Sequence, residues 1–190
     1  MKNTFTLLYL LLLLSVPSFA QTKWKVDPQH SSLNFNISHS GISIVNGKFT
    51  DYTGNLTTSG EKLDNAAFDF TVEIKSINTN VDARDNHLKS GDFFDADKFP
   101  KMTFKSTKIL ATGKPNQYLL YGNLTIKNVT KEVIFDAYYG GNLKSKQGEK
   151  IGMKAETIIN RFDYGIDYDP TAVGVGKEVT VIVHLQFAKQ

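Results

Sequence analysis

Cysteine is absent from the 190 residues of the sequence. Its absence excludes disulfide bridges, thiolate metal ligands and a thiol nucleophile, so a hydrophobic core must stabilise the fold. A marked surplus of one charge is also missing, because 22 basic side chains stand against 19 acidic ones, with a net charge of +3. This balance argues against a surface that binds nucleic acid or another polyanion.

Apolar runs long enough to cross a membrane are lacking as well. The chain has a basic residue, Lys2, near its start, continues with a nearly unbroken leucine run at 7–14, and reaches the small residues Ser18 and Ala20. These are the parts of a secretory signal peptide, and the leucine run is shorter than the about 20 apolar residues of a spanning helix. We therefore predict a signal peptide over residues 1–20. The mature chain is then exported to the periplasm or secreted, and is soluble after cleavage.

Motifs of catalytic and metal sites are missing too. The histidines show no H-E-x-x-H or i,i+4 spacing, the clustered aspartates do not follow the EF-hand pattern, and no G-x-S-x-G is present. We therefore predict no cofactor, no metal site and no catalytic residue. The aspartates are interpreted as turn formers. The histidines interpreted as surface or barrel-rim residues are His30, His39, His87 and His184.

What the sequence has in abundance is alternation of apolar and polar residues over short segments. The clearest segments are 33–37, 68–75, 118–126, 133–139 and 179–187, and Gly, Asn, Asp and Pro residues separate them. Such a pattern is typical of hairpins in one antiparallel sheet. About eight strands are expected, and closure into a barrel would remove their exposed edges. The fold class predicted is therefore all-β, with an antiparallel lipocalin-like barrel.

The interior of such a barrel decides its function. At about eight strands the lumen is either packed with side chains or just wide enough for a small ligand. The inward candidates are mostly Phe, Leu, Val and Ile, so a cavity lined by them would take an elongated apolar molecule. Composition leaves both a filled and a hollow barrel open.

One charged stretch interrupts the alternation, and we predict a short helical insertion near residues 82–99. Asp82 can cap a short helix, and the rings of Phe93 and Phe94 follow it. A helix with two aromatic neighbours must bury them against another part of the fold. In an all-β chain, that part is the open end or the inside of the curved sheet.

Three cationic or titratable residues, Arg84, His87 and Lys89, lie on this predicted helix. In one interpretation they lie near a cavity mouth and meet a phosphate or a quinone carbonyl. In the other, Arg84 pairs with Asp92 or Asp95 and holds the insertion in place. Both interpretations remain open at this point.

Distinctive motifs follow one another along the mature chain. They are Trp24–Asp27 with His30 and Ser31, Phe35–His39, Gly47–Phe49, Arg84–Ser90 with Asp92–Asp95, Pro100–Ser106, Gly122–Ile126 with Val129–Lys131, and Arg161–Gly165. Through these motifs the chain resembles the YceI-like family of periplasmic proteins over essentially its whole mature length. Two departures from the family pattern are Asn128 at a tight turn, which tolerates a left-handed backbone, and Tyr164, whose hydroxyl needs a partner if it is buried.

The resemblance implies an extended lipocalin-like barrel over residues 21–190 that binds a polyisoprenoid or isoprenoid-quinone chain. It implies a carrier, a store or a stress-related sequestering protein, and no enzyme. Its partner is a long-chain isoprenoid lipid, with transient membrane contact during exchange, and the protein is a monomer or a homodimer. The head group is expected near the insertion, at Arg84, His87 and Lys89. The candidate residues for the apolar tail are Phe35, Ile37, Phe68, Phe70, Val72, Phe93, Phe94, Phe104, Leu124, Ile126, Phe135, Val183 and Leu185.

Two alternatives belong to other functional classes. A hydrolase or isomerase of a small exported substrate would use His87 and nearby carboxylates, and it requires converging polar groups in a cleft. A protein-interaction module would have a filled barrel with no connected void. The geometry of the interior distinguishes all three hypotheses.

Overall fold

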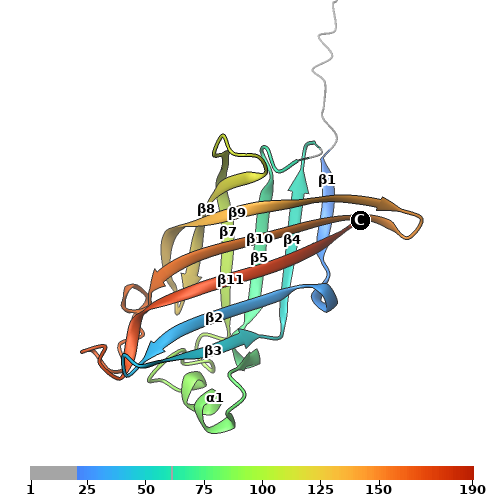
Figure 1. Ribbon diagram of the computed structural model, residues 1–190. Helices are drawn as coiled ribbons and strands as arrows, with labels where there is room; N and C mark the ends of the chain where they lie inside the picture. The colour runs from blue at the N-terminus through green and yellow to red at the C-terminus, as the bar shows by residue number, and fades with distance from the viewer. Residues whose placement is uncertain (1–20, 61) are drawn as a thin grey trace, which may run out of the picture.

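The computed structural model describes residues 21–60 and 62–190, and the predicted signal peptide lies outside them. Most of the described chain is strand (Figure 1). None of its helices is both long and apolar enough to span a membrane. The elements are β1 (Thr22–Val26), η1 (Pro28–His30), β2 (Ser32–His39), β3 (Ser43–Phe49), β4 (Tyr52–Thr58), β5 (Ala67–Glu73), η2 (Ile74–Ser76), β6 (Ile77–Asn78), α1 (Asp82–Lys89), β7 (Lys101–Ala111), β8 (Gln117–Ile126), β9 (Val129–Ser145), β10 (Gly148–Asn160), η3 (Arg161–Tyr164) and β11 (Val175–Lys189).

The strands form one antiparallel sheet that closes into a barrel. Its order is β1-β4-β5-β7-β8-β9-β10-β11, and β1 completes the ring by pairing with β11, where Val26 lies opposite Phe187. The other part of β11 pairs with β2, which β3 and β6 follow in the sheet. The predicted lipocalin-like, antiparallel barrel of about eight strands is confirmed.

Three barrel strands are each broken into two segments. η1 separates β1 from β2, residues 50–51 separate β3 from β4, and η2 separates β5 from β6. The segments keep the same neighbours, because β2 pairs with β3 as β1 pairs with β4, and β3 pairs with β6 as β4 pairs with β5. The barrel is therefore an up-and-down meander whose wall bends part-way along its length.

This up-and-down order places each connection at one of two ends of the barrel. The α1 segment, residues 161–174 between β10 and β11, and the β2–β3 hairpin gather at one end, here called the α1 end (Figure 1, bottom). The start of β1, the end of β11 and the β7–β8 connection lie at the opposite end, here called the terminal end. The predicted insertion thus covers one opening of the barrel.

The terminal end is filled with side chains. Leu56, Ile151 and Phe187 are fully buried there, and the indole of Trp24 donates a hydrogen bond of 3.0 Å to Thr58 Oγ1. A large apolar side chain that is fully buried contributes about 1.5–3 kcal/mol to stability. This packed end therefore supplies much of the core on which a cysteine-free fold depends.

The entry into α1 differs from the prediction, and the assignment of Asp82 as its cap is wrong. Val81 is the N-cap and makes no side-chain hydrogen bond, while Asp82 is the first helical residue. The helix is held instead by buried Asp85, whose Oδ1 accepts hydrogen bonds from Thr79 N at 2.8 Å and from Thr79 Oγ1 at 2.5 Å. Since a helix this short is unstable alone, this carboxylate fixes it to the end of the sheet.

Candidate functional site

A cavity of about 190 Å³ occupies the half of the barrel next to α1. All eight barrel strands contribute to its wall, the strand made of β1 and β2 through β2 alone. Between Val179 and Leu185 it follows roughly 20 Å of β11, at about 3.3 Å per residue. The barrel is thus neither wholly filled nor wholly hollow, since its terminal end is packed and its α1 half is open inside.

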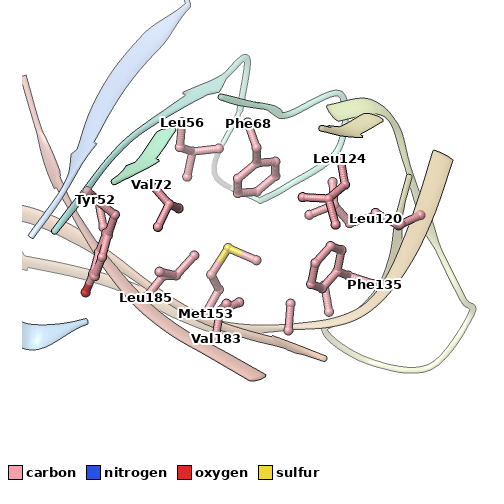
Figure 2. Close-up of a cluster of buried hydrophobic side chains, with 14 of the residues drawn as sticks. Tyr52, Leu56, Phe68, Val72, Leu120, Leu124, Phe135, Met153, Val183 and Leu185 are labelled. Carbon is pink, nitrogen blue, oxygen red and sulfur yellow. The ribbon is translucent and has the colours of Figure 1, made fainter. Parts of the chain in front are cut away.

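Every candidate for the apolar tail lines this cavity. The thirteen residues from Phe35 to Leu185 all belong to its wall, although their role in binding stays a prediction. In Figure 2 the labelled side chains, Phe68, Leu124 and Met153 among them, point from opposite sides of the wall toward the centre. The other lining residues are Leu33, Asn34, Phe49, Tyr52, Leu88, Met102, Thr103, Leu120, Met153, Ala155, Ile159, Arg161, Tyr164, Ile166, Val175, Val179 and Val181.

The lining is almost wholly apolar. Its polar members are few, and the one charged side chain among them is Arg161. An apolar wall offers a ligand burial but no hydrogen bonds along most of its length. Such a cavity therefore suits a hydrocarbon chain and excludes small polar substrates, whose polar groups would lose their hydration without replacement.

Aromatic contacts hold the insertion across the α1 end. Phe94 packs edge-on against Phe49 of β3, with ring centroids 6.1 Å apart. On the other side, Tyr168 of the β10–β11 segment contacts Phe93 at 4.8 Å and His87 at 5.0 Å. The α1 segment is therefore a cap that is fastened on two sides, and it contributes Phe93 and Phe94 to the cavity wall.

The three candidates for the head group do not line the cavity. Arg84 donates hydrogen bonds to Thr79 Oγ1 at 2.8 Å and to the Thr79 carbonyl at 2.9 Å. The interpretation that pairs Arg84 with Asp92 or Asp95 is wrong, because the side chain turns back to Thr79, three residues before the start of its helix. Asp92 instead lies 2.9 Å from His87 Nε2. Arg84 and His87 are thus engaged on the outer side of the cap.

Arg161 is the cation that the sequence analysis did not assign to the site. It is 3% exposed, and its guanidinium donates to the carbonyls of Ile166, Asp169, Val175 and Gly176 at 2.6–3.1 Å. Burial lowers the pKa of Arg161 because the cation loses hydration, while nearby Asp169 and Asp167 raise it. A positive charge held by backbone carbonyls therefore lies at the α1 end of an apolar cavity.

Tyr164 follows Arg161 in the short helix η3, and its hydroxyl makes no hydrogen bond within the part of the chain that the structure describes. Its side chain is fully buried, and its hydroxyl has no hydrogen-bond partner among the described residues. Burial raises the pKa of Tyr164 to about 12, so the hydroxyl is a donor at neutral pH. A buried hydroxyl is expected to have a hydrogen-bond partner, so Tyr164 presents an unsatisfied donor at this end of the cavity.

A seam in the barrel wall runs past Tyr164. The pairing of β9 with β10 ends at Asp136 and Glu156, although both strands continue toward the α1 end. A groove of about 320 Å³ lies there, lined by residues of both strands and by Tyr164. Ile134 and Ile158 are exposed beside it. Tyr164 thus borders both the inner cavity and this outer groove.

The clustered acids form turns in the structure. Asp169 Oδ2 accepts hydrogen bonds from the backbone N–H groups of Gly174 and Val175 at 2.6 and 2.8 Å. A hydrogen bond from Thr171 and these backbone bonds lower the pKa of Asp169. Among residues 21–60 and 62–190, no group of three or more His, Asp or Glu residues could hold a metal ion.

Comparison with known proteins identifies relatives over most of the chain. A family model described as the YceI-like domain matches residues 24–187. The UPF0312 protein PputW619_0484 of Pseudomonas putida strain W619 is 35% identical over 170 residues, which cover 87% of this chain and 88% of the relative. The UPF0312 protein SAB2563 of Staphylococcus aureus is 38% identical over 175 residues, covering 88% and 98%.

Solved structures share the fold. The Campylobacter jejuni YCEI protein matches with a TM-score of 0.69 and 31% identity, over 78% of this chain and 86% of that one. Burkholderia cenocepacia BcnA has a TM-score of 0.76 and 22% identity, over 85% and 98%. A polyisoprenoid binding domain from Saccharophagus degradans has a TM-score of 0.69 and 16% identity, over 88% and 98%. With this barrel and a match over residues 24–187, the chain belongs to the YceI-like family.

Proposed function

We propose that this protein is an exported lipid-binding protein that holds one polyisoprenoid or isoprenoid-quinone chain in its cavity. The observation that carries the proposal is the apolar cavity that extends along the barrel axis from a packed floor to the α1 cap. The description of the Saccharophagus degradans domain as polyisoprenoid binding supports the same ligand class. The role is that of a carrier, a store or a stress-related sequestering protein, as a monomer or a homodimer that contacts membranes transiently.

The apolar lining favours a long chain over a short one. Burial contributes about 0.8 kcal/mol for each CH₂ group. Association costs about 4–15 kcal/mol in lost freedom of motion. A ligand with only a few carbons cannot offset that cost in a cavity that offers hydrogen bonds at one end alone, whereas a long chain can.

The polar end of the ligand has two candidate positions. Arg161 and Tyr164 lie at the wall of the cavity, where the free hydroxyl can donate to a carbonyl or another oxygen of the head group. Arg84, His87 and Lys89 lie on the cap, where they can meet a head group that emerges at the rim. We favour Tyr164 because its donor has no partner, while Arg84 and His87 already have theirs.

The proposal contains no catalytic step. The hydrolase or isomerase hypothesis needs His87 to face a polar cleft, but His87 lies outside the cavity and pairs with Asp92. The filled-barrel hypothesis needs an interior with no connected void, whereas the α1 half contains a cavity. Both observations support lipid binding over these alternatives.

The test compares the wild type with a variant whose cavity is filled. Ala155→Trp adds a large ring inside the lumen, whereas Lys154→Trp adds the same ring outside on the same strand. Mass spectrometry of organic extracts, from protein produced in a bacterium with its signal peptide intact, should find stoichiometric isoprenoid in the wild type and in Lys154→Trp. Ala155→Trp should fold, as judged by circular dichroism, and lack the lipid. No isoprenoid in the wild type, together with no uptake of added quinone, would contradict the proposal.

A further inference from the structure

Inward-facing glycines of the barrel wall lie beneath phenylalanine rings. Gly47 is the register partner of Phe35 across β3 and β2, and Gly54 is the partner of Phe70 across β4 and β5. A Cβ atom at either glycine would lie less than 3.0 Å from the facing ring. Each ring therefore occupies the space that a side chain on the opposite strand would need.

Gly122 on β8 and Phe104 on β7 form a third such contact between diagonal neighbours. We call the three contacts the Gly–Phe pairs. None of their glycines has a positive φ angle, so the backbone itself does not require glycine there. Glycine weakens a strand interior because it adds backbone freedom and no packing. The close approach of the ring is thus the physical reason for the missing side chain at Gly47 and Gly54. At Gly122 the carbonyl oxygen of Lys105, 2.8 Å from the same Cβ position, adds to the contact with the ring.

A second aromatic ring holds each phenylalanine of the Gly–Phe pairs in place. The contacts are edge-on or tilted, at centroid separations typical of favourable aromatic pairs. The ring is therefore confined between the glycine and its aromatic neighbour. These contacts are Phe35–Phe49 at 5.8 Å, Phe70–Phe187 at 6.0 Å and Phe104–Phe135 at 5.4 Å.

The Gly–Phe pairs explain how a barrel of this size contains a cavity. Side chains alone can fill the lumen of an eight-stranded barrel. All three rings belong to the cavity wall, yet they lie over glycines of neighbouring strands and leave the axis free. We propose that the Gly–Phe pairs set the width of the cavity, and thereby decide whether a methyl-branched chain can enter it.

The inference rests on the proposed function and deepens it. Methyl branches make an isoprenoid chain thicker than a straight acyl chain of equal length. A narrower lumen therefore overpacks a branched chain before it overpacks a straight one. Glycine at these positions is what distinguishes a wall that admits branched chains from one that admits only straight chains.

The experiment uses two fatty acids as probes. Phytanic acid and hexadecanoic acid share their backbone and carboxylate, and differ only in the methyl branches of phytanic acid. Delipidated wild-type protein should bind both. Gly54→Ala should lower the affinity for phytanic acid by about tenfold and change that for hexadecanoic acid much less, because the displaced Phe70 ring narrows the lumen. Isothermal titration gives both dissociation constants.

Two further variants and a control complete the test. Phe70→Leu removes the ring and should shift the preference toward phytanic acid. The double variant Gly54→Ala/Phe70→Leu should return the affinity ratio toward the wild-type value, since the two residues act on one space. Gly152→Ala is the control, because its Cβ has no heavy atom within 4 Å.

The outcomes separate this inference from the function on which it rests. Failure of the wild type to bind either acid or any isoprenoid would count against the proposed function itself. Binding of both acids, with the same affinity ratio in Gly54→Ala and Phe70→Leu as in the wild type, would overturn the role of the Gly–Phe pairs. If Gly54→Ala does not fold, Phe70→Leu alone still decides, because a ring that sets the width must change the ratio when it is removed.

Discussion

At the scale of single residues, the unusual atom is the hydroxyl of Tyr164. A buried donor without a partner costs about 1–3 kcal/mol relative to a satisfied one. The ring of Tyr164 contributes packing, since the side chain is fully buried. Packing alone does not explain why this residue is a tyrosine and not a phenylalanine. A ligand that supplies the acceptor would explain the hydroxyl, so this atom can test where the head group lies.

Tyr164→Phe removes only that oxygen. We expect the free energy of unfolding of the ligand-free protein to stay constant or rise, because no bond is lost. The affinity for a quinone should fall about tenfold, while the affinity for the hydrocarbon squalene stays the same. Urea denaturation and fluorescence titration measure both quantities. Tyr52→Phe, at another tyrosine of the cavity wall, is the control and should leave the affinity for quinone unchanged.

The same substitution has a signature at high pH. The pKa of Tyr164 rises from 10.0 to about 12 on folding, so the folded state holds this proton more tightly than the unfolded state. The contribution of this bound proton to the free energy of unfolding is complete below pH 10 and is lost as the pH rises toward 12. Wild-type stability should therefore fall more steeply than that of Tyr164→Phe in this range. Parallel stability curves for the two proteins would argue against the burial of the hydroxyl.

At the scale of elements, the cap is a short helix with aromatic residues behind it. Phe94 touches Phe49 and also lines the cavity, so it connects the cap to the sheet and to the cavity wall. Phe99 belongs to the same insertion and does not line the cavity. Truncating Phe94 and Phe99 in separate variants therefore distinguishes the cap's contribution to folding from its contribution to binding.

Phe94→Ala should weaken lipid binding and speed lipid release. Because Phe94 is only partly buried, its loss should cost less than the about 3–5 kcal/mol of a fully buried phenylalanine. Phe99→Ala is the matched variant and should leave lipid release unchanged. Stopped-flow transfer of a fluorescent isoprenoid to acceptor vesicles gives the release rates. Equal rates in the two variants would mean that the cap does not retain the ligand.

The sequence predicts well which residues face the inside of the barrel, but it predicts poorly which residues lie at the α1 end of the cavity. Strand periodicity is two, so once Phe68 is assigned to the lumen, Phe70 and Val72 follow it. The position of Arg161 depends instead on a segment that folds back to present its carbonyls. The Gly–Phe pairs depend on the register between strands. Alternation encodes neither the register nor the path of a loop, so the sequence pattern predicts neither the Gly–Phe pairs nor the position of Arg161.

At the scale of the whole molecule, the barrel is divided into a packed half and a hollow half. Two isoleucines of β10 lie on either side of this division. Ile151 is fully buried in the packed half, whereas Ile159 lines the cavity. The same truncation at the two positions therefore probes two environments on one strand.

Ile151→Ala should lower the free energy of unfolding of the ligand-free protein by about 2–5 kcal/mol and leave the affinity for lipid unchanged. Ile159→Ala should cost less, because its side chain already faces open space, and it should alter the affinity. Chemical denaturation and lipid titration of both variants provide the comparison. A larger loss of stability at Ile159 than at Ile151 would show that the hollow half carries the fold.

The filled terminal end also makes the lumen a blind tube. Leu56 and Ile151 are buried in the packed end beyond the cavity, so a hydrocarbon that enters from the α1 end stops short of them. Under the proposed function, each isoprene unit beyond that depth would stay outside, so the depth of the cavity would limit the length of chain that it encloses. The last unit to enter would be the first to leave, and unloading would begin with the head group.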